Sequence, residues 1–216
     1  MSAARLVATF GALLGVAGLV LQFLLIVTSM TAEGATWFEA TWRYFAYFTI
    51  LTNTFVTLVM ARAALKPADL VGLNAPRIEL MAVTSIVFVG VVYNVLLASQ
   101  WDPQGWQKVA DVIVHDAVPI VVVLFWLLRP HGSLKWSDAG FAAIWPAAYA
   151  VYGLSRGALD GFYPYFFLDP TQASMLAIAS NLLGLVVVFV LGALAFIALG
   201  RTLGRASRSD ERRANG

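Results

Sequence analysis

Cysteine is absent from this chain, and charged residues are scarce. Without cysteine there are no disulfides, no thiol nucleophile and no cysteine ligands for a metal. Charged residues make up 12% of the 216 residues and apolar residues 60%, whereas a soluble domain carries roughly 25% charged residues. The apolar residues come in continuous blocks of about 20, the length that spans a hydrocarbon core of roughly 30 Å. The composition therefore predicts a polytopic α-helical membrane protein.

Histidine is also scarce, because the chain has only His115 and His131. His131 follows the fourth apolar block, whereas His115 lies within it. This spacing keeps the two imidazoles at different depths, so a shared metal or haem iron is excluded. We predict no metal site and no cofactor.

Six apolar segments are long enough to cross a bilayer, and we predict an all-α bundle of six transmembrane helices, kinked at Pro119 and Pro146. The segments are Leu6–Thr28, Tyr44–Leu65, Glu79–Ala98, Val109–Leu128, Ala139–Leu154 and Ala173–Leu199. Residues 1–200 form this transmembrane domain. Residues 201–216 are polar and basic, and we predict a disordered tail that lies against anionic headgroups.

Basic residues are divided unequally between the two ends of these segments. One end has Arg5, Arg62, Lys66, Arg77, Arg129, Lys135 and the basic tail, and the other has Arg43, Lys108 and Arg156. Cytoplasmic loops of membrane proteins are enriched in Lys and Arg. We therefore predict a plasma-membrane protein with both termini in the cytoplasm. The positive charge reflects topology, and no nucleic-acid partner is predicted.

The stretch Asp111-Val-Ile-Val-His115-Asp116-Ala-Val-Pro119 places ionisable groups inside an apolar segment. Such groups are costly at membrane depth and indicate a functional site. Asp111 and His115 are four residues apart and share a helix face. Asp116 points about 100° away, so we expect it to pair with another helix. Pro119 removes the hydrogen bond that the His115 carbonyl would accept.

Other segments place polar side chains at a similar depth in the outer half of the bilayer. These residues are Thr49, Thr52 and Asn53 in the second segment, Asn94 in the third, Tyr149, Tyr152 and Arg156 in the fifth, and Ser180 and Asn181 in the sixth. Together with His115 they predict one cavity that opens toward the outer leaflet. For each threonine and asparagine alone, the alternative is a structural hydrogen bond within or between helices.

A hydroxyl nucleophile and a histidine on facing helices suit acyl transfer. The histidine takes the hydroxyl proton and returns it to the leaving alkoxide, and Asp111 could orient the imidazole. Asn53, Asn94 or a tyrosine could donate to the oxyanion, and Arg156 could hold a substrate carboxylate. Two alternatives stay open. One is a proton-coupled transporter that uses His115 and Asp116, and the other is a membrane protein without chemistry.

Four motifs in order resemble the bacterial "Pr-six-Pr" six-span membrane proteins. They are Arg43-Tyr-Phe-Ala-Tyr-Phe-Thr49, His115-Asp-Ala-Val-Pro119, Trp145-Pro-Ala-Ala-Tyr149 and Tyr163-Pro-Tyr-Phe-Phe-Leu-Asp169. That family is similar to the eukaryotic androgen-induced protein and androgen-dependent TFPI-regulating protein, which hydrolyse fatty acid esters of hydroxy fatty acids. The resemblance implies Thr49 as nucleophile and His115 as its partner, with Thr52 as the rival nucleophile. We expect a membrane lipid or lipid-like ester as substrate, bound by Tyr149, Tyr152, Arg156 and Asn181.

Overall fold

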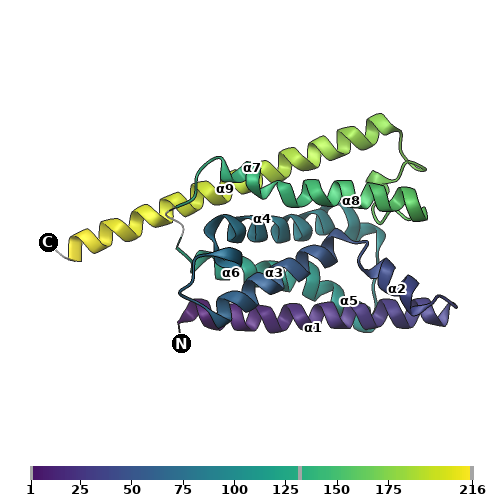
Figure 1. Ribbon diagram of the computed structural model, residues 1–216, viewed down its shortest axis with the longest axis horizontal. Coiled ribbons are helices and arrows are strands. Elements are labelled where there is room, and N and C mark those ends of the chain that lie inside the picture. The colour runs from purple at the N-terminus through teal and green to yellow at the C-terminus, as the bar shows by residue number, and fades with distance from the viewer. Residues whose placement is uncertain (1, 131–132, 215–216) are drawn as a thin grey trace.

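The computed structural model describes residues 2–130 and 133–214, with side chains as far as Gly204, so His131 lies outside the described residues. The described part is all helical and contains no strand (Figure 1). The long helices are α1 (Ala3–Ala32), α3 (Phe48–Leu65), α4 (Pro76–Val92), α6 (Val118–Leu127), α8 (Ile144–Asp160) and α9 (Met175–Ala214). The short ones are α2 (Trp37–Tyr44), η1 (Gly72–Asn74), η2 (Tyr93–Leu97), η3 (Ala98–Gln100), α5 (Gly105–Val112), η4 (Ile113–Ala117), α7 (Asp138–Ala142) and η5 (Phe166–Leu168).

Within the described ranges, five continuous helical segments are long and apolar enough to cross a membrane. They are Ala3–Ala32, Phe48–Leu65, Pro76–Gln100, Gly105–Leu127 and Met175–Gly204. These five segments correspond to the first, second, third, fourth and sixth predicted spans. The chain is therefore a helical protein with the apolar helices of a multi-pass membrane protein.

The predicted fifth span is divided into α7 and α8, which meet at Ala143. The cause lies in Pro146, which has no N–H and whose ring blocks the carbonyl four residues back, that of Ala142. Helix α7 ends at Ala142, and Pro146 lies in the first turn of α8, where proline is tolerated. Alone, α8 has 17 residues, short of the roughly 20 that a span needs.

The start of the predicted second span is a separate helix. A capping box begins α2, because Thr36 accepts from the Glu39 amide while the Glu39 carboxylate accepts from the Thr36 amide. Tyr44 ends this helix, and α3 begins only at Phe48. The sequence analysis began the second span at Tyr44 and missed this interruption, which determines the environment of Thr49.

The last helix, α9, extends beyond the predicted sixth span. Its backbone is helical to Ala214, within the stretch from residue 201 for which a disordered tail stays a prediction. Arginine, alanine and glutamate favour the helix, and extending a helix that already exists avoids the cost of nucleating a new one.

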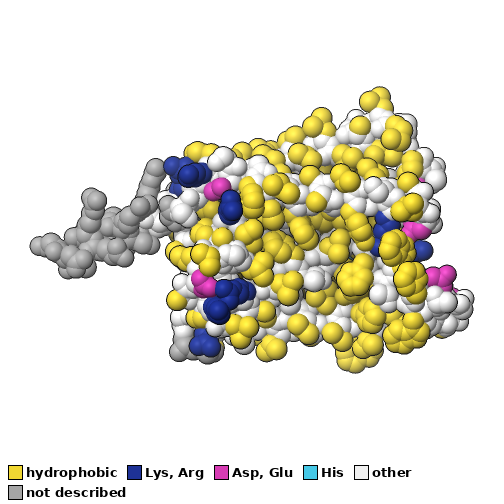
Figure 2. Space-filling view, viewed as in Figure 1, with side chains coloured by type: hydrophobic (Ala, Val, Ile, Leu, Met, Phe, Trp, Pro, Cys, Tyr) yellow, Lys and Arg dark blue, Asp and Glu magenta, His cyan; other side chains and the backbone are white. Residues whose placement is uncertain are grey.

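Small residues bring α1 close to its neighbours inside the bundle. A Cβ at Gly15 would meet Thr57 of α3, and one at Gly18 would meet Ile113 of η4. These glycines therefore serve internal packing. The outward faces are apolar instead, and Figure 2 shows hydrophobic side chains over most of the visible surface between the two ends.

The basic residues gather at the ends of the bundle, as the sequence predicts. At the end that carries the N-terminus, Arg5 donates to the Ala64 carbonyl at 3.0 Å and Arg129 donates to Glu79 at 2.8 Å. At the other end, Arg43 lies over the Phe162 ring, with its guanidinium carbon 3.4 Å from the ring centroid. Both chain ends lie at the first of these ends (Figure 1).

Candidate active site

Thr49 and His115 lie within hydrogen-bond distance of each other. The Thr49 Oγ1 atom is 3.4 Å from His115 Nε2. Thr49 is in the first turn of α3, and His115 lies in η4, the π-helical turn between α5 and α6. The two residues are 66 positions apart in sequence, so the bundle brings them together from separate membrane helices.

The start of α3 leaves the Thr49 hydroxyl available for His115. Threonine in a helix usually donates to the carbonyl four residues back, as Thr54 does to Ile50 at 2.8 Å. For Thr49 that carbonyl belongs to Phe45, which precedes α3 and accepts instead from the Tyr152 hydroxyl at 2.9 Å. In the same way, the Tyr149 hydroxyl donates to the neighbouring Ala46 carbonyl at 2.9 Å. Tyr149 and Tyr152 therefore fix the break before α3.

The surroundings of His115 assign its tautomer. Its Nδ1 atom lies 3.1 Å from the Asp111 carbonyl oxygen and 3.2 Å from Asp111 Oδ1. Both are acceptors, and a backbone carbonyl can only accept, so Nδ1 carries the proton. Nε2 is then unprotonated and can accept from the Thr49 hydroxyl. This is the tautomer that a general base requires.

Tyr93 contacts both Asp111 and His115. The sequence analysis did not identify this residue. Its hydroxyl donates to Asp111 Oδ2 at 2.5 Å. Its ring stacks on the His115 imidazole, with centroids 3.8 Å apart and planes 10° from parallel. Tyr93 lies beside Asn94 at the depth already singled out, so the same depth rule could have identified it. Both stacked residues lie in π-helical turns, η2 and η4, which occur often at functional sites.

Gly90 makes room for the carbonyl of His115. Pro119 supplies no N–H to this carbonyl, which turns toward α4. A Cβ at Gly90 would lie 2.8 Å from the His115 oxygen and 3.5 Å from Pro119 Cγ. Only glycine lets the backbones of α4 and η4 approach this closely.

The side-chain amides of Asn53 and Asn94 each donate both of their N–H groups to partners within the protein, so neither has one left for a substrate. Asn53 donates to the Thr49 carbonyl at 2.9 Å and to the Val114 carbonyl at 3.1 Å, which ties α3 to η4. Asn94 donates to the Gly90 carbonyl at 3.0 Å and to Asp116 Oδ1 at 2.9 Å. Neither amide therefore stabilises an oxyanion in this arrangement. Asp116 pairs with another helix, as its direction predicts.

The rival nucleophile Thr52 has a different partner. Its hydroxyl accepts from the Trp145 indole N–H at 3.0 Å, which joins α3 to α8. Thr52 is fully buried and does not line the cavity described next. Thr49 is therefore the threonine with access to both a base and a cavity.

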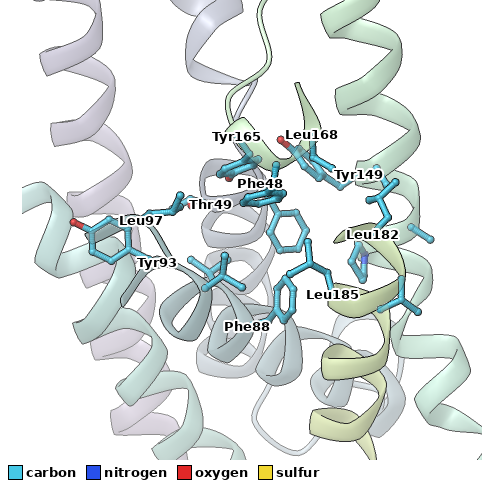
Figure 3. A pocket seen from close by; sticks show the side chains of 17 residues that line it. Phe48, Thr49, Phe88, Tyr93, Leu97, Tyr149, Tyr165, Leu168, Leu182 and Leu185 are labelled. Atoms are coloured by element: carbon cyan, nitrogen blue, oxygen red, sulfur yellow. The ribbon is translucent and has the colours of Figure 1, made fainter. Parts of the chain in front are cut away.

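A cavity, called the chamber below, lies beside Thr49 and has a volume of about 80 Å³. In Figure 3, Thr49 and Tyr93 lie on one side, Leu182 and Leu185 of α9 on the other, and Tyr165 and Leu168 over the top. The only polar side chains in its described lining are the hydroxyls of Thr49, Tyr93, Tyr149 and Tyr165. His115 lies outside the lining and reaches the chamber through Thr49. Together with Asn94 and Asp116, His115 borders a different, shallow groove between α4 and α6.

Tyr165 brings a second hydroxyl close to that of Thr49. Burial raises the pKa of the Tyr165 phenol to about 12, while the Thr49 hydroxyl and the amides of Thr49 and Phe48 act in the opposite direction. Within the described chain, these two amides donate to no backbone carbonyl, because they begin α3. The Tyr165 phenol and these two amides therefore lie close to the Thr49 hydroxyl, and hydrogen-bond donors grouped in this way are able to stabilise an oxyanion.

The remaining predicted binding residues have structural partners. Arg156 donates to the Tyr152 hydroxyl at 2.6 Å and to the Trp42 carbonyl, and it lies 3.6 Å from Asp160. Asn181 donates to the Phe167 carbonyl at 3.0 Å and so anchors the segment that covers the chamber. Tyr149 alone of the four predicted binding residues lines the chamber.

Over residues 2–130 and 133–214, no group of three His, Cys, Asp or Glu side chains is placed to hold a metal ion. Compared with known proteins, the chain matches no family model, no curated protein and no solved structure.

Proposed function

We propose that this chain is an integral membrane hydrolase of lipid esters, with Thr49 as nucleophile and His115 as general base. The observation that carries the proposal is the hydrogen-bonded series Thr49–His115–Asp111–Tyr93 beside an apolar chamber. Each member orients the next, which is the logic of a nucleophile, a base and an orienting group. The resemblance to the bacterial six-span proteins, which are similar to eukaryotic hydrolases, implies the same assignment.

In the first step, Thr49 Oγ1 attacks the ester carbonyl carbon while its proton passes to His115 Nε2. The C–O bond of the ester breaks as the tetrahedral intermediate collapses. The departing alkoxide takes the proton from Nε2, which leaves the acyl group on Thr49 and releases an alcohol. Tyr165 and the first amides of α3 stabilise the negative oxygen of the intermediate.

In the second step, a water molecule gives a proton to Nε2 and attacks the acyl carbon. The bond to Thr49 breaks, Thr49 regains the proton, and a fatty acid leaves. Asp111 faces Nδ1 in both steps and stabilises the imidazolium that forms. Asp111 is 4% exposed, so this interaction is little weakened by solvent.

The proton-coupled transporter is less well supported. It uses His115 and Asp116, which border the same groove. Asp116 pairs there with Asn94, whereas His115 pairs with Thr49 and Asp111. A hydrolase uses all the close contacts of His115, and a transporter leaves the Thr49 contact without a role.

For the membrane topology, we propose six crossings of the plasma membrane with both termini in the cytoplasm. In this arrangement α7 and α8 together form the fifth crossing, and the chain bends at Pro119 and Pro146. Two observations support it. Both chain ends lie at the same end of the bundle (Figure 1), which requires an even number of crossings. Arg156 of α8 contacts Trp42 at the opposite end.

Ester hydrolysis by the purified chain in detergent tests the proposed function. The substrates are long-chain fatty acyl esters, and the variants are Thr49→Val, His115→Gln and Thr52→Val. Thr54→Val is the matched control, since Thr54 only donates to its own helix. We expect the first two variants to lose activity by at least about 10³-fold, and the control to retain it. Loss in Thr52→Val with full activity in Thr49→Val would reassign the nucleophile, and no turnover by a folded wild type would refute the proposal.

A further inference from the structure

The chamber beside Thr49 contains no charged side chain in its described lining. Its walls come from α3, α4, η2, α8, α9 and the segment around η5, and they are aromatic and aliphatic apart from four hydroxyls. Two of these hydroxyls are already donated, that of Tyr93 to Asp111 and that of Tyr149 to the Ala46 carbonyl. A bound ester therefore meets the Thr49 hydroxyl, which is paired with His115, the Tyr165 hydroxyl close to it, and an apolar surface.

Arg156 and Arg43, two basic residues at this end of the bundle, do not line the chamber and already have partners. Arg156 is 4% exposed, and its guanidinium is held by Tyr152, the Trp42 carbonyl and Asp160. One face of this guanidinium also covers the Trp42 ring at 3.9 Å. Arg43 stacks in the same way on Phe162. The arginines at this end of the bundle serve the fold.

The segment over the chamber, residues 162–170, supplies no cation either. Tyr165 stacks on Phe167 at 5.2 Å, and both lie over the chamber with Leu168. Asp169 follows at once, and hydrogen bonds from the Thr171 side chain and amide hold the pKa of its carboxyl below the usual range. Asp169 is therefore ionised at neutral pH, and its carboxylate accepts from Thr171 and Gln172 outside the described lining of the chamber.

We infer that the substrates are uncharged esters, and that an ester with a free carboxylate on its acyl or alcohol chain is selected against. This inference rests on the proposed function. A carboxylate that enters the chamber loses its water and gains neither a cation nor an array of donors, which is costly. An uncharged chain loses nothing and gains the apolar contact. The selectivity differs from the fatty acid esters of hydroxy fatty acids that the family resemblance suggests.

The test compares two substrates that differ only in charge. One is a long-chain acyl ester of a hydroxy fatty acid with its carboxylate free. The other is the same ester with that carboxylate replaced by a primary carboxamide of the same shape. Both are presented to the purified wild type at the same mole fraction in micelles of a neutral detergent, and release of the same acyl acid is measured. We expect kcat/KM to be at least about tenfold higher for the carboxamide.

A charge introduced into the chamber gives a second readout. Leu182 lines the chamber from α9. Leu182→Lys should lower the carboxamide preference by at least about tenfold, whereas the uncharged control Leu182→Met should keep it. Equal rates for the two substrates, or a faster free acid, would overturn the inference while leaving the hydrolase intact. Failure to cleave either ester, or equal cleavage by Thr49→Val, would instead overturn the proposed function.

Discussion

The aromatic ring of Tyr93 lies parallel to the imidazole of His115, 3.8 Å away, while its hydroxyl donates to the carboxylate that holds Nδ1 of the same imidazole. One side chain thus fixes the plane of the histidine and the position of its acidic partner. Because each contact uses a different part of the tyrosine, substitutions can separate the two effects.

Replacing Tyr93 by phenylalanine keeps the stacked ring and removes the hydrogen bond to Asp111. A hydrogen bond to a charged group contributes roughly 1.5–3 kcal/mol, so we expect kcat for ester hydrolysis to fall by about 10- to 100-fold with KM little changed. Tyr93→Ala should lose more, because the imidazole is then free to turn. Tyr44→Phe is the matched control, since the Tyr44 hydroxyl donates to the Leu19 carbonyl away from the site. Full activity in Tyr93→Phe would argue against a positioning role.

Gly90→Ala tests the close approach of α4 to the His115 carbonyl. The new methyl group would lie 2.8 Å from that oxygen, and overpacking of this kind costs about 1–3 kcal/mol. We expect a lower thermal unfolding temperature and reduced hydrolysis. Gly184→Ala provides the contrast, because a Cβ there meets nothing within 4 Å and alanine favours a helix by roughly 0.5–1 kcal/mol. Equal melting temperatures for the two variants would contradict the packing described here.

The chamber should make activity depend on acyl chain length. Each methylene removed from water contributes about 0.8 kcal/mol, or roughly fourfold in kcat/KM. We expect kcat/KM, measured over a series of acyl esters, to rise at each step until the chamber is full. Ala150→Phe reduces the space in the chamber and should shift the optimum to shorter chains. Ala148→Phe lies outside the lining and should not. An optimum that stays in place in Ala150→Phe would show that the acyl chain binds elsewhere.

The natural lack of cysteine makes the fifth crossing easy to test. Lys135→Cys lies before α7 and Pro170→Cys lies after α8, and both positions are exposed. If α7 and α8 together cross the bilayer, a membrane-impermeant maleimide added to intact cells should label Pro170→Cys alone. Lys135→Cys should be labelled only after the cells are opened. Labelling of both variants from the same side would contradict six crossings.

Several features of the site follow from sequence rules alone. The four-residue spacing of Asp111 and His115 places both on one helix face, and the structure brings them to 3.2 Å. The lengths of the apolar helices and the positions of basic residues at their ends could also be predicted from the sequence. Such features depend on periodicity and composition, which act over short stretches of chain.

The features that were missed depend on contacts between distant segments. Whether Asn53 donates to a substrate or to the Val114 carbonyl is decided by the neighbouring helix, which is 61 residues away. Arg156 was assigned to a substrate carboxylate because the indole and carbonyl of Trp42, 114 residues earlier, could not be placed beside it. The capping box at Thr36 and Glu39 was a local signal for the start of α2, whereas the break before α3 involves contacts with Tyr149 and Tyr152 of α8.

Covalent labelling of the nucleophile tests the proposed chemistry. The purified chain is treated with a long-chain alkyl fluorophosphonate, which phosphonylates an activated hydroxyl with loss of fluoride, and the modified residue is mapped by peptide mass spectrometry. We expect one adduct, on Thr49, with labelling abolished in Thr49→Val and strongly slowed in His115→Gln. An adduct on Thr52 or on a serine in a chain that hydrolyses esters, or labelling of Thr49 at the same rate without His115, would contradict the Thr49–His115 mechanism.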